Sequence, residues 1–138
     1  MGEINTEFLT KCIDTLERSY QCLKNSENGS IDYEMYRNSL VKSFEITLEQ
    51  SGKLLKKKIL PFFASKKAVD QLTFKDLFRN AHKHGLLDEN EVIRWLAYRD
   101  NRNDTAHDYG QEFADRTVLL IADFITDSKR IRDTIANG

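Results

Sequence analysis

The residues best suited to chemistry lie in one octapeptide, Arg102–Tyr109, with the sequence RNDTAHDY. Arg102 supplies a permanent planar charge that suits phosphate, and His107 can take up and release protons near neutral pH. Tyr109 carries a phenol hydroxyl that can be modified. Because these groups stand at short, fixed spacing, the octapeptide predicts phosphodiester or nucleotide chemistry.

Cleavage of RNA through its own 2′-hydroxyl needs a base that accepts the hydroxyl proton and a cation that holds the charge developing on phosphorus. His107 and Arg102 are the candidates for these catalytic roles. Asn103 could support them by holding the His107 ring, or it could cap a helix end. In an unbroken helix Arg102 and His107 would point about 140° apart. Either the helix ends inside the octapeptide, or a second subunit completes a composite cleft, and we favour a symmetric homodimer.

The same residues also have ordinary structural interpretations. An arginine or histidine at a helix end is more often a cap or a surface charge than a catalyst. Asp104 and Asp108 could bind a metal with His107, but two carboxylates and one imidazole make a weak ligand set. We therefore expect no metal and no other cofactor.

Length and charge limit what surrounds the octapeptide. With 138 residues, the chain fits one domain spanning residues 1–138. Lysine and arginine total 21 against 22 acidic residues, which gives a net charge of -1. Because this balance does not attract a polyanion, any contact with nucleic acid must be local.

Local positive charge is densest in two stretches of the sequence. Lys56 and Lys57 are candidate contacts for RNA or an acidic partner, in a set with Lys53, Lys58, Lys66 and Lys67. Arg79 lies in a second set, with Lys75, His82 and Lys83 at helical spacing, and Arg99 lies just before the octapeptide. A solvated helix face is the structural alternative for these sets.

The remaining sequence features indicate in which cellular compartment the protein is expected. Cys12 and Cys22 lie about 15 Å apart along one predicted helix, too far for a disulfide, so we expect reduced thiols. The N-terminus has no basic region followed by an apolar run, and no window approaches the roughly 18 apolar residues of a membrane span. We expect a soluble, cytoplasmic protein with no membrane contact.

Helical periodicity dominates the chain. We predict a first helix from the cap Thr6 to about Lys24, with Phe8 and Leu9 in its apolar stripe, and a second from Asp32 to Pro61. A loop or irregular turn follows up to Leu72. Further helices are predicted at 74–84, from Asp88 into the octapeptide, and after Tyr109-Gly110. The fold class is therefore all-α, an up-and-down antiparallel four-helix bundle with an additional short helix, and its first two helices should pack antiparallel.

In the octapeptide, four residues separate the arginine from the histidine and one residue separates the histidine from the tyrosine. This pattern resembles the signature of the HEPN superfamily. Phe44–Glu49, Phe78–Leu86, and Trp95 with Arg99-Asp100 resemble its nucleotidyltransferase substrate-binding subgroup, over roughly residues 8 to 130. The resemblance implies a metal-independent ribonuclease toxin and a minimal nucleotidyltransferase as its antitoxin partner. It also implies that this partner adenylylates Tyr109.

We therefore predict a homodimeric HEPN-type ribonuclease that acts through Arg102 and His107 and is controlled through Tyr109. In the alternative, the protein is a non-catalytic subunit that binds nucleotide or substrate for a two-component nucleotidyltransferase. In a further alternative, the octapeptide only stabilises a dimer scaffold.

Overall fold

The computed structural model describes residues 3–105 and 111–137, and within these it leaves the side chains of residues 103–105, 111 and 113 undescribed. The described residues form helices and no strand, which confirms the all-α class. The elements are α1 (Glu7–Lys24), α2 (Ile31–Ile59), the 3-10 turn η1 (Leu60–Phe62), α3 (Lys66–Asp70), α4 (Phe74–Lys83), α5 (Glu89–Thr105) and α6 (Gln111–Ala136).

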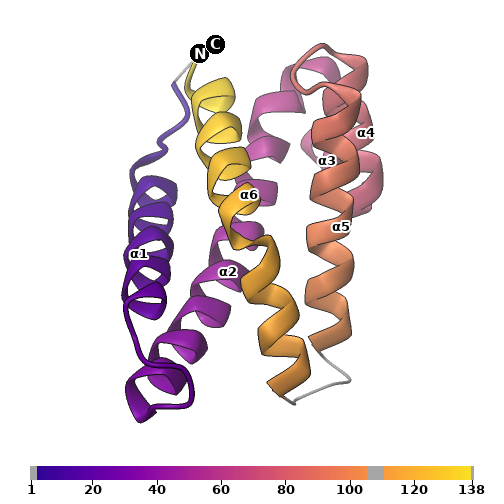
Figure 1. The fold of residues 1–138 in the computed structure, drawn as a ribbon. Coiled ribbons are helices and arrows are strands. Elements are labelled where there is room, and N and C mark those ends of the chain that lie inside the picture. Colours follow the sequence, from indigo (N-terminus) through magenta and orange to yellow (C-terminus); the bar gives the residue numbers. More distant parts are fainter. Residues whose placement is uncertain (1–2, 106–110, 138) are drawn as a thin grey trace.

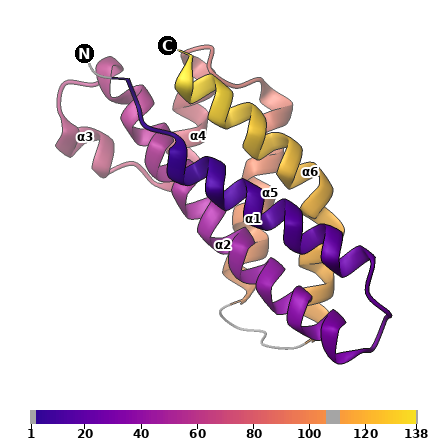
Figure 2. The same cartoon turned by 90° about the vertical axis from the view of Figure 1, so that its left-hand side faces the viewer.

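The four long helices α1, α2, α5 and α6 run alternately up and down, as predicted (Figure 1). α2 and α6 pack against each other at the centre; α1 covers one side of the pair, and α5 covers the other together with α4. α3 projects to one side beside the end of α2 (Figure 2). The predicted antiparallel packing of α1 on α2 is confirmed.

Local signals explain where most helices begin and end. The Thr73 hydroxyl accepts a hydrogen bond from the Asp76 amide, and Asp88 and Glu91 cap the start of α5 reciprocally. α4 ends in a Schellman motif, in which the Leu86 amide donates to the Ala81 carbonyl. Gly85 has a φ of 76° there, which suits glycine because it lacks a Cβ atom.

Three details of the predicted helices need correction. Thr6 is the N-cap of α1 as predicted, but its side chain forms no capping bond, and Asn5 Oδ1 accepts a hydrogen bond from the Glu7 amide instead. α2 begins at Ile31 rather than Asp32, because Ser30 accepts from the Tyr33 amide and is the N-cap. The segment expected to be a loop or turn contains α3, which is capped by the Ser65 hydroxyl and buries Val69.

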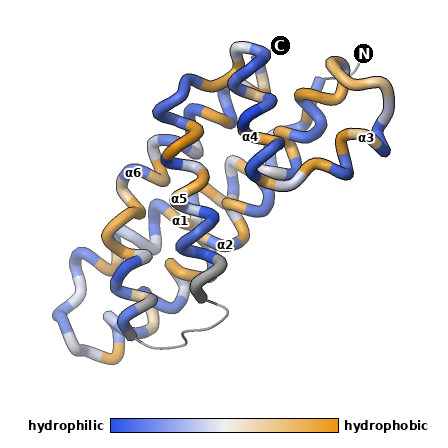
Figure 3. The backbone as a smooth tube through the Cα atoms, turned by 90° about the vertical axis from the view of Figure 1, so that its right-hand side faces the viewer, coloured by the Kyte–Doolittle hydropathy of each residue, from blue (hydrophilic) through white to orange (hydrophobic). Residues whose placement is uncertain are grey.

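Apolar side chains from all the long helices fill the core. Hydrophobic and hydrophilic positions alternate along the helices (Figure 3), so that each helix turns its apolar stripe inward. Phe44, Trp95, Tyr98 and Phe124 form a cluster of edge-to-face ring contacts between α2, α5 and α6. The prediction that Phe8 is in the core is wrong: this side chain is 56% exposed, because α1 turns Leu9 and not its neighbour inward.

Two expectations about the compartment can be compared with the described residues. Cys12 and Cys22 are both free thiols, as expected. Within the described ranges, no helix combines the length and apolar character needed to cross a membrane.

Candidate functional site: a basic groove beside the octapeptide

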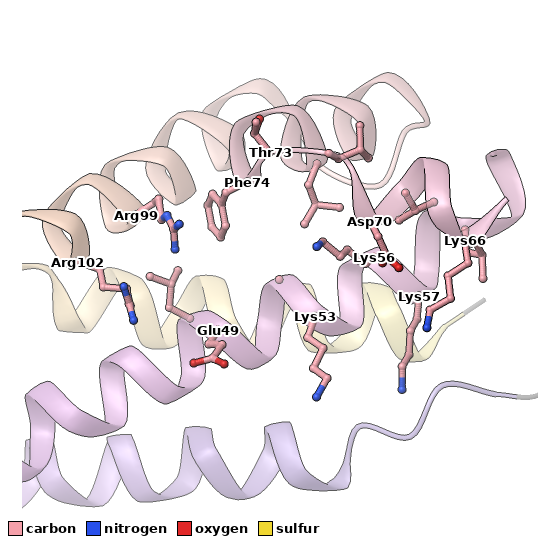
Figure 4. A pocket seen from close by; sticks show the side chains of 16 residues that line it. Glu49, Lys53, Lys56, Lys57, Lys66, Asp70, Thr73, Phe74, Arg99 and Arg102 are labelled. Atoms are coloured by element: carbon pink, nitrogen blue, oxygen red, sulfur yellow. The ribbon is translucent and has the colours of Figure 1, made fainter. Parts of the chain in front are cut away.

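A groove of about 980 Å³ lies between α2 and the layer formed by α3, α4 and α5. Its lining joins parts of the chain that are far apart in sequence, from Leu48 on α2 to Arg102 on α5. Figure 4 shows the charged side chains around it, with Arg99 pointing into the space and Lys53, Lys57 and Lys66 along an open edge. The groove is therefore reachable from solvent.

Helical spacing explains why these charges share one groove. Lys53 stands three residues before Lys56 and four before Lys57 on α2, so it is a neighbour of both on the helix surface. Lys56 points into the space, and Lys53 and Lys57 point away from it along the outer side of α2 (Figure 4). Arg99 and Arg102 are likewise three residues apart on α5, and both line the groove from the opposite side. Lys56 of α2 and Arg99 of α5 therefore point into the same space, and the other cations line its margin (Figure 4).

The floor of the groove is largely apolar: Leu72 is half-buried there, and Leu48, Val69 and Leu77, which are buried, complete the lining. The Phe74 ring belongs to this floor, and the Arg99 guanidinium lies 5.2 Å from its centroid in a cation–π contact. Gly52 is buried opposite, where an added Cβ atom would lie 3.5 Å from Phe74 Cε2. The small residue in mid-helix leaves the space that Phe74 and the groove occupy.

The charge of the groove differs from that of the whole chain. Six basic side chains line it, Lys53, Lys56, Lys57, Lys66, Arg99 and Arg102, whereas its acidic side chains are Glu49 and Asp70. This excess of four positive charges stands on a chain whose net charge is -1. The groove can attract an anion locally although the molecule as a whole cannot.

Side-chain bonds fix α5, and with it the two arginines, against α6. Asp127 of α6 accepts hydrogen bonds from Arg94 Nε at 2.8 Å and Nη2 at 2.9 Å, and from the Tyr98 hydroxyl. The hydrogen bond to Asp127 raises the pKa of Arg94, and burial followed by the same carboxylate raises the pKa of Tyr98. Asn101 Nδ2 donates to Thr117 Oγ1 at 2.9 Å, one residue before Arg102.

The structure brings together four of the site residues predicted from the sequence. Arg102, Arg99, Lys56 and Lys57 line the same groove, whereas Arg79 is exposed on α4 and is not part of the lining.

The rest of the predicted site is less completely described. Asn103 lies within α5, but its side chain is not described, and His107 and Tyr109 lie outside the described residues. The described part of α5 reaches Thr105, inside the octapeptide. Among the described residues, no group of three or more His, Cys, Asp or Glu side chains could hold a metal ion.

Comparison with known proteins decides the family. The profile of the family described as "Nucleotidyltransferase substrate binding protein like" matches residues 5–137. The chain belongs to this family.

Relatives of this family agree in sequence and in fold. A Haemophilus influenzae protein named probable ribonuclease HepT is 34% identical over 88 residues, which are 64% of this chain and 59% of that protein. The alignment thus spans less than two thirds of the curated relative. A H. influenzae structure, described as the fold of a substrate-binding domain of a nucleotidyltransferase, superposes with a TM-score of 0.83 and 27% identity over 95% of this chain and 98% of the other.

A second solved structure, from Thermus thermophilus, has a TM-score of 0.72 at 22% identity, covers 92% of this chain and 98% of the other, and supports the fold alone.

Within the family fold, sequence reasoning missed Gly52 and Phe74 as parts of the site. The signal that could have found them was a glycine in the middle of a long helix. Glycine lowers the stability of a helix there, so its presence indicates that a neighbouring group packs close to the helix backbone.

Proposed function

We propose that this family member is a metal-independent endoribonuclease of the HEPN type that works as a homodimer. The observation that carries the proposal is the position of Arg102, which lines a groove with an excess of positive charge. The name of the H. influenzae relative, probable ribonuclease HepT, supports the same reaction class. A polyanion held in this groove would lie beside the octapeptide that carries His107.

In the proposed reaction, His107 accepts the proton of a ribose 2′-hydroxyl while the 2′-oxygen attacks the adjacent phosphorus. The bond from phosphorus to the 5′-oxygen breaks, and His107 of the second subunit donates a proton to that leaving oxygen. The products are a 2′,3′-cyclic phosphate and a 5′-hydroxyl. Arg102 holds the negative charge of the pentacoordinate phosphorus, and Asn103 supports the His107 ring.

The cleavage assay uses RNA, the purified protein and an excess of chelator. Wild type should still cut, because the proposed steps use only side chains, and His107→Ala should lose cleavage while its circular dichroism spectrum stays helical. Cleavage that stops on chelation would reject the metal-free mechanism. An active His107→Ala protein would remove the proposed base.

Regulation is the second part of the proposal: a partner minimal nucleotidyltransferase neutralises the enzyme by adenylylating Tyr109. The added AMP would place bulk and negative charge beside the groove and repel RNA. Incubation with the nucleotidyltransferase and ATP should add one adenylyl mass to wild type and none to Tyr109→Phe. Wild type that gains no mass would contradict this part.

One alternative has an observation in its favour. The family description and the H. influenzae structure both refer to substrate binding for a nucleotidyltransferase, which suits a non-catalytic subunit that binds nucleotide or substrate. A groove of this size with cations and an apolar floor can hold a nucleotide. Nucleotide binding by a wild-type protein that never cuts RNA would favour this function over the first.

A further inference from the structure

The groove has two features that one ligand would have to match together. Its basic side chains come from α2 and α3 on one side and from α5 on the other, and its floor is apolar. An inorganic anion would use only the cations, and a purely apolar ligand would use only the floor. A chain that alternates phosphates with flat apolar rings matches both features.

We infer that this groove binds a single-stranded segment of RNA that flanks the bond to be cut. The inference rests on the proposed function, because it assigns the groove to the substrate of the octapeptide. The phosphates lie along Lys53, Lys56 and Lys57. The bases lie against Leu60, Leu72 and Phe74, the apolar lining side chains that are at least partly exposed. Arg99 and Arg102 bound the end of the groove that leads to the octapeptide (Figure 4).

The floor selects single-stranded over double-stranded RNA. Bases in a duplex are stacked and paired, so their faces cannot reach an apolar floor, whereas unpaired bases can be splayed out. Leu60 is 36% exposed in the lining of the groove, where it offers apolar surface to a base. Duplex RNA would meet only the cations.

Binding is measured with His107→Ala protein, so that cleavage does not disturb the equilibrium. The probe is a labelled single-stranded oligoribonucleotide of about 16 nucleotides, the upper end of the site sizes of single-strand-binding folds. Substituting Lys53, Lys56 and Lys57 together by Gln should weaken binding at least about tenfold. It should also make the slope of log affinity against log salt shallower by about 2, since each phosphate contact contributes about 0.7.

Two further variants distinguish binding in the groove from nonspecific attraction of RNA by surface charge. The matched control substitutes Lys11, Lys24 and Lys42, which are exposed and lie outside the lining, by Gln. This control should change neither affinity nor slope by a comparable amount. Leu60→Ser should weaken single-strand binding and leave the salt slope unchanged, because it removes no charge.

Several outcomes would overturn the inference. One is an equal loss of RNA affinity in the two triple-lysine variants. Another is that the duplex made with the complementary strand binds as tightly as the single strand. A third is that the groove variant no longer binds an acidic nucleotidyltransferase partner but still binds RNA. The cleavage assay is independent of this result. Wild type that binds RNA through the groove but never cuts would refute the proposed function alone, and cleavage with groove-independent binding would refute this inference alone.

Discussion

Asp127 is the most heavily bonded buried carboxylate among the described residues. It is 2% exposed and accepts three hydrogen bonds from α5, two from Arg94 and one from Tyr98. Charge-assisted, bidentate bonds of this kind fix the relative position of two helices more rigidly than apolar contacts do. The register of α5 on α6, and hence the place of Arg99 and Arg102, depends on this residue.

Asp127→Asn should therefore destabilise the fold. The substitution leaves the Arg94 charge without its counter-ion, and breaking a buried pair costs about 3–5 kcal/mol. Since the Arg94 side chain is 36% exposed, water compensates part of this loss, and we expect about 2–3 kcal/mol in the free energy of unfolding. Chemical denaturation measures the change. Asp133→Asn, on the exposed side of the same helix, is the control and should stay within about 0.5 kcal/mol.

Glu91 predicts a pH dependence. Burial, with smaller contributions from the charges of Asp88 and Asp127, raises the pKa of this carboxyl. The folded protein therefore keeps the proton to higher pH than the unfolded chain does, so stability falls as pH rises from the ordinary glutamate pKa through the raised one. Gln at this position can still accept the capping bond from the Asp88 amide.

The free energy of unfolding of wild type, relative to Glu91→Gln, should thus decrease as pH rises above the ordinary glutamate pKa of about 4.3. Urea titrations at several pH values give this difference directly. Glu89→Gln, at an exposed position in the same helical turn, is the matched control. A difference that grows with pH would show that the Glu91 carboxylate is stabilised when charged.

At the scale of elements, the sequence predicts what depends on neighbours along the chain. The caps at Thr73 and Asp88 and the stop at Gly85 are local signals of this kind, and all three are present in the structure. α3 escaped prediction because five residues carry too little periodicity, and its stability comes from burying Val69 against the core. Signals that are local in the sequence predict where helices begin and end, but they do not predict which surfaces the helices bury when they pack.

The groove could not be predicted in this way. The basic stretch near Lys56 was visible in the sequence, but its position opposite Arg99 and Arg102 depends on how α5 packs across α2 and α4. Arg79, which has equally good helical spacing, lies outside the groove for the same reason. The geometry between Arg102 and His107 stays a prediction.

Gly52 offers a prediction about α2 as an element. Glycine in a helix interior costs up to about 1 kcal/mol relative to alanine, and a Cβ atom here would make an ordinary 3.5 Å contact with Phe74. Gly52→Ala should therefore stabilise the protein by about 0.5–1 kcal/mol, seen as a higher midpoint of thermal unfolding. Gly52→Leu should destabilise it, because the larger side chain would have to displace the Phe74 ring. Equal stability of both variants would contradict the packing of Phe74 on this glycine.

At the scale of the whole molecule, the proposed homodimer needs a surface that a second copy can cover. Leu119 on α6 is 86% exposed, and Ile93 on α5 is 59% exposed. Thr117 accepts a hydrogen bond from Asn101, the residue before Arg102. Leu119 is two residues after Thr117 on α6, so it lies at nearly the same height along the bundle as Arg102. A contact between two copies at this level would bring both octapeptides towards one two-fold axis.

Leu119→Glu should therefore convert a dimer into a monomer and abolish RNA cleavage, while circular dichroism stays unchanged because the side chain has no place in the core. Light scattering coupled to size-exclusion chromatography gives the mass of each species. Phe8→Glu is the control, since Phe8 is also exposed but lies on α1, which packs on the opposite side of the central pair from α5. Like charges facing each other across a two-fold axis cost several kcal/mol, which is enough to dissociate a dimer of ordinary affinity. Cleavage by a monomeric Leu119→Glu protein would show that one subunit carries the complete site, and the composite cleft would have to be abandoned.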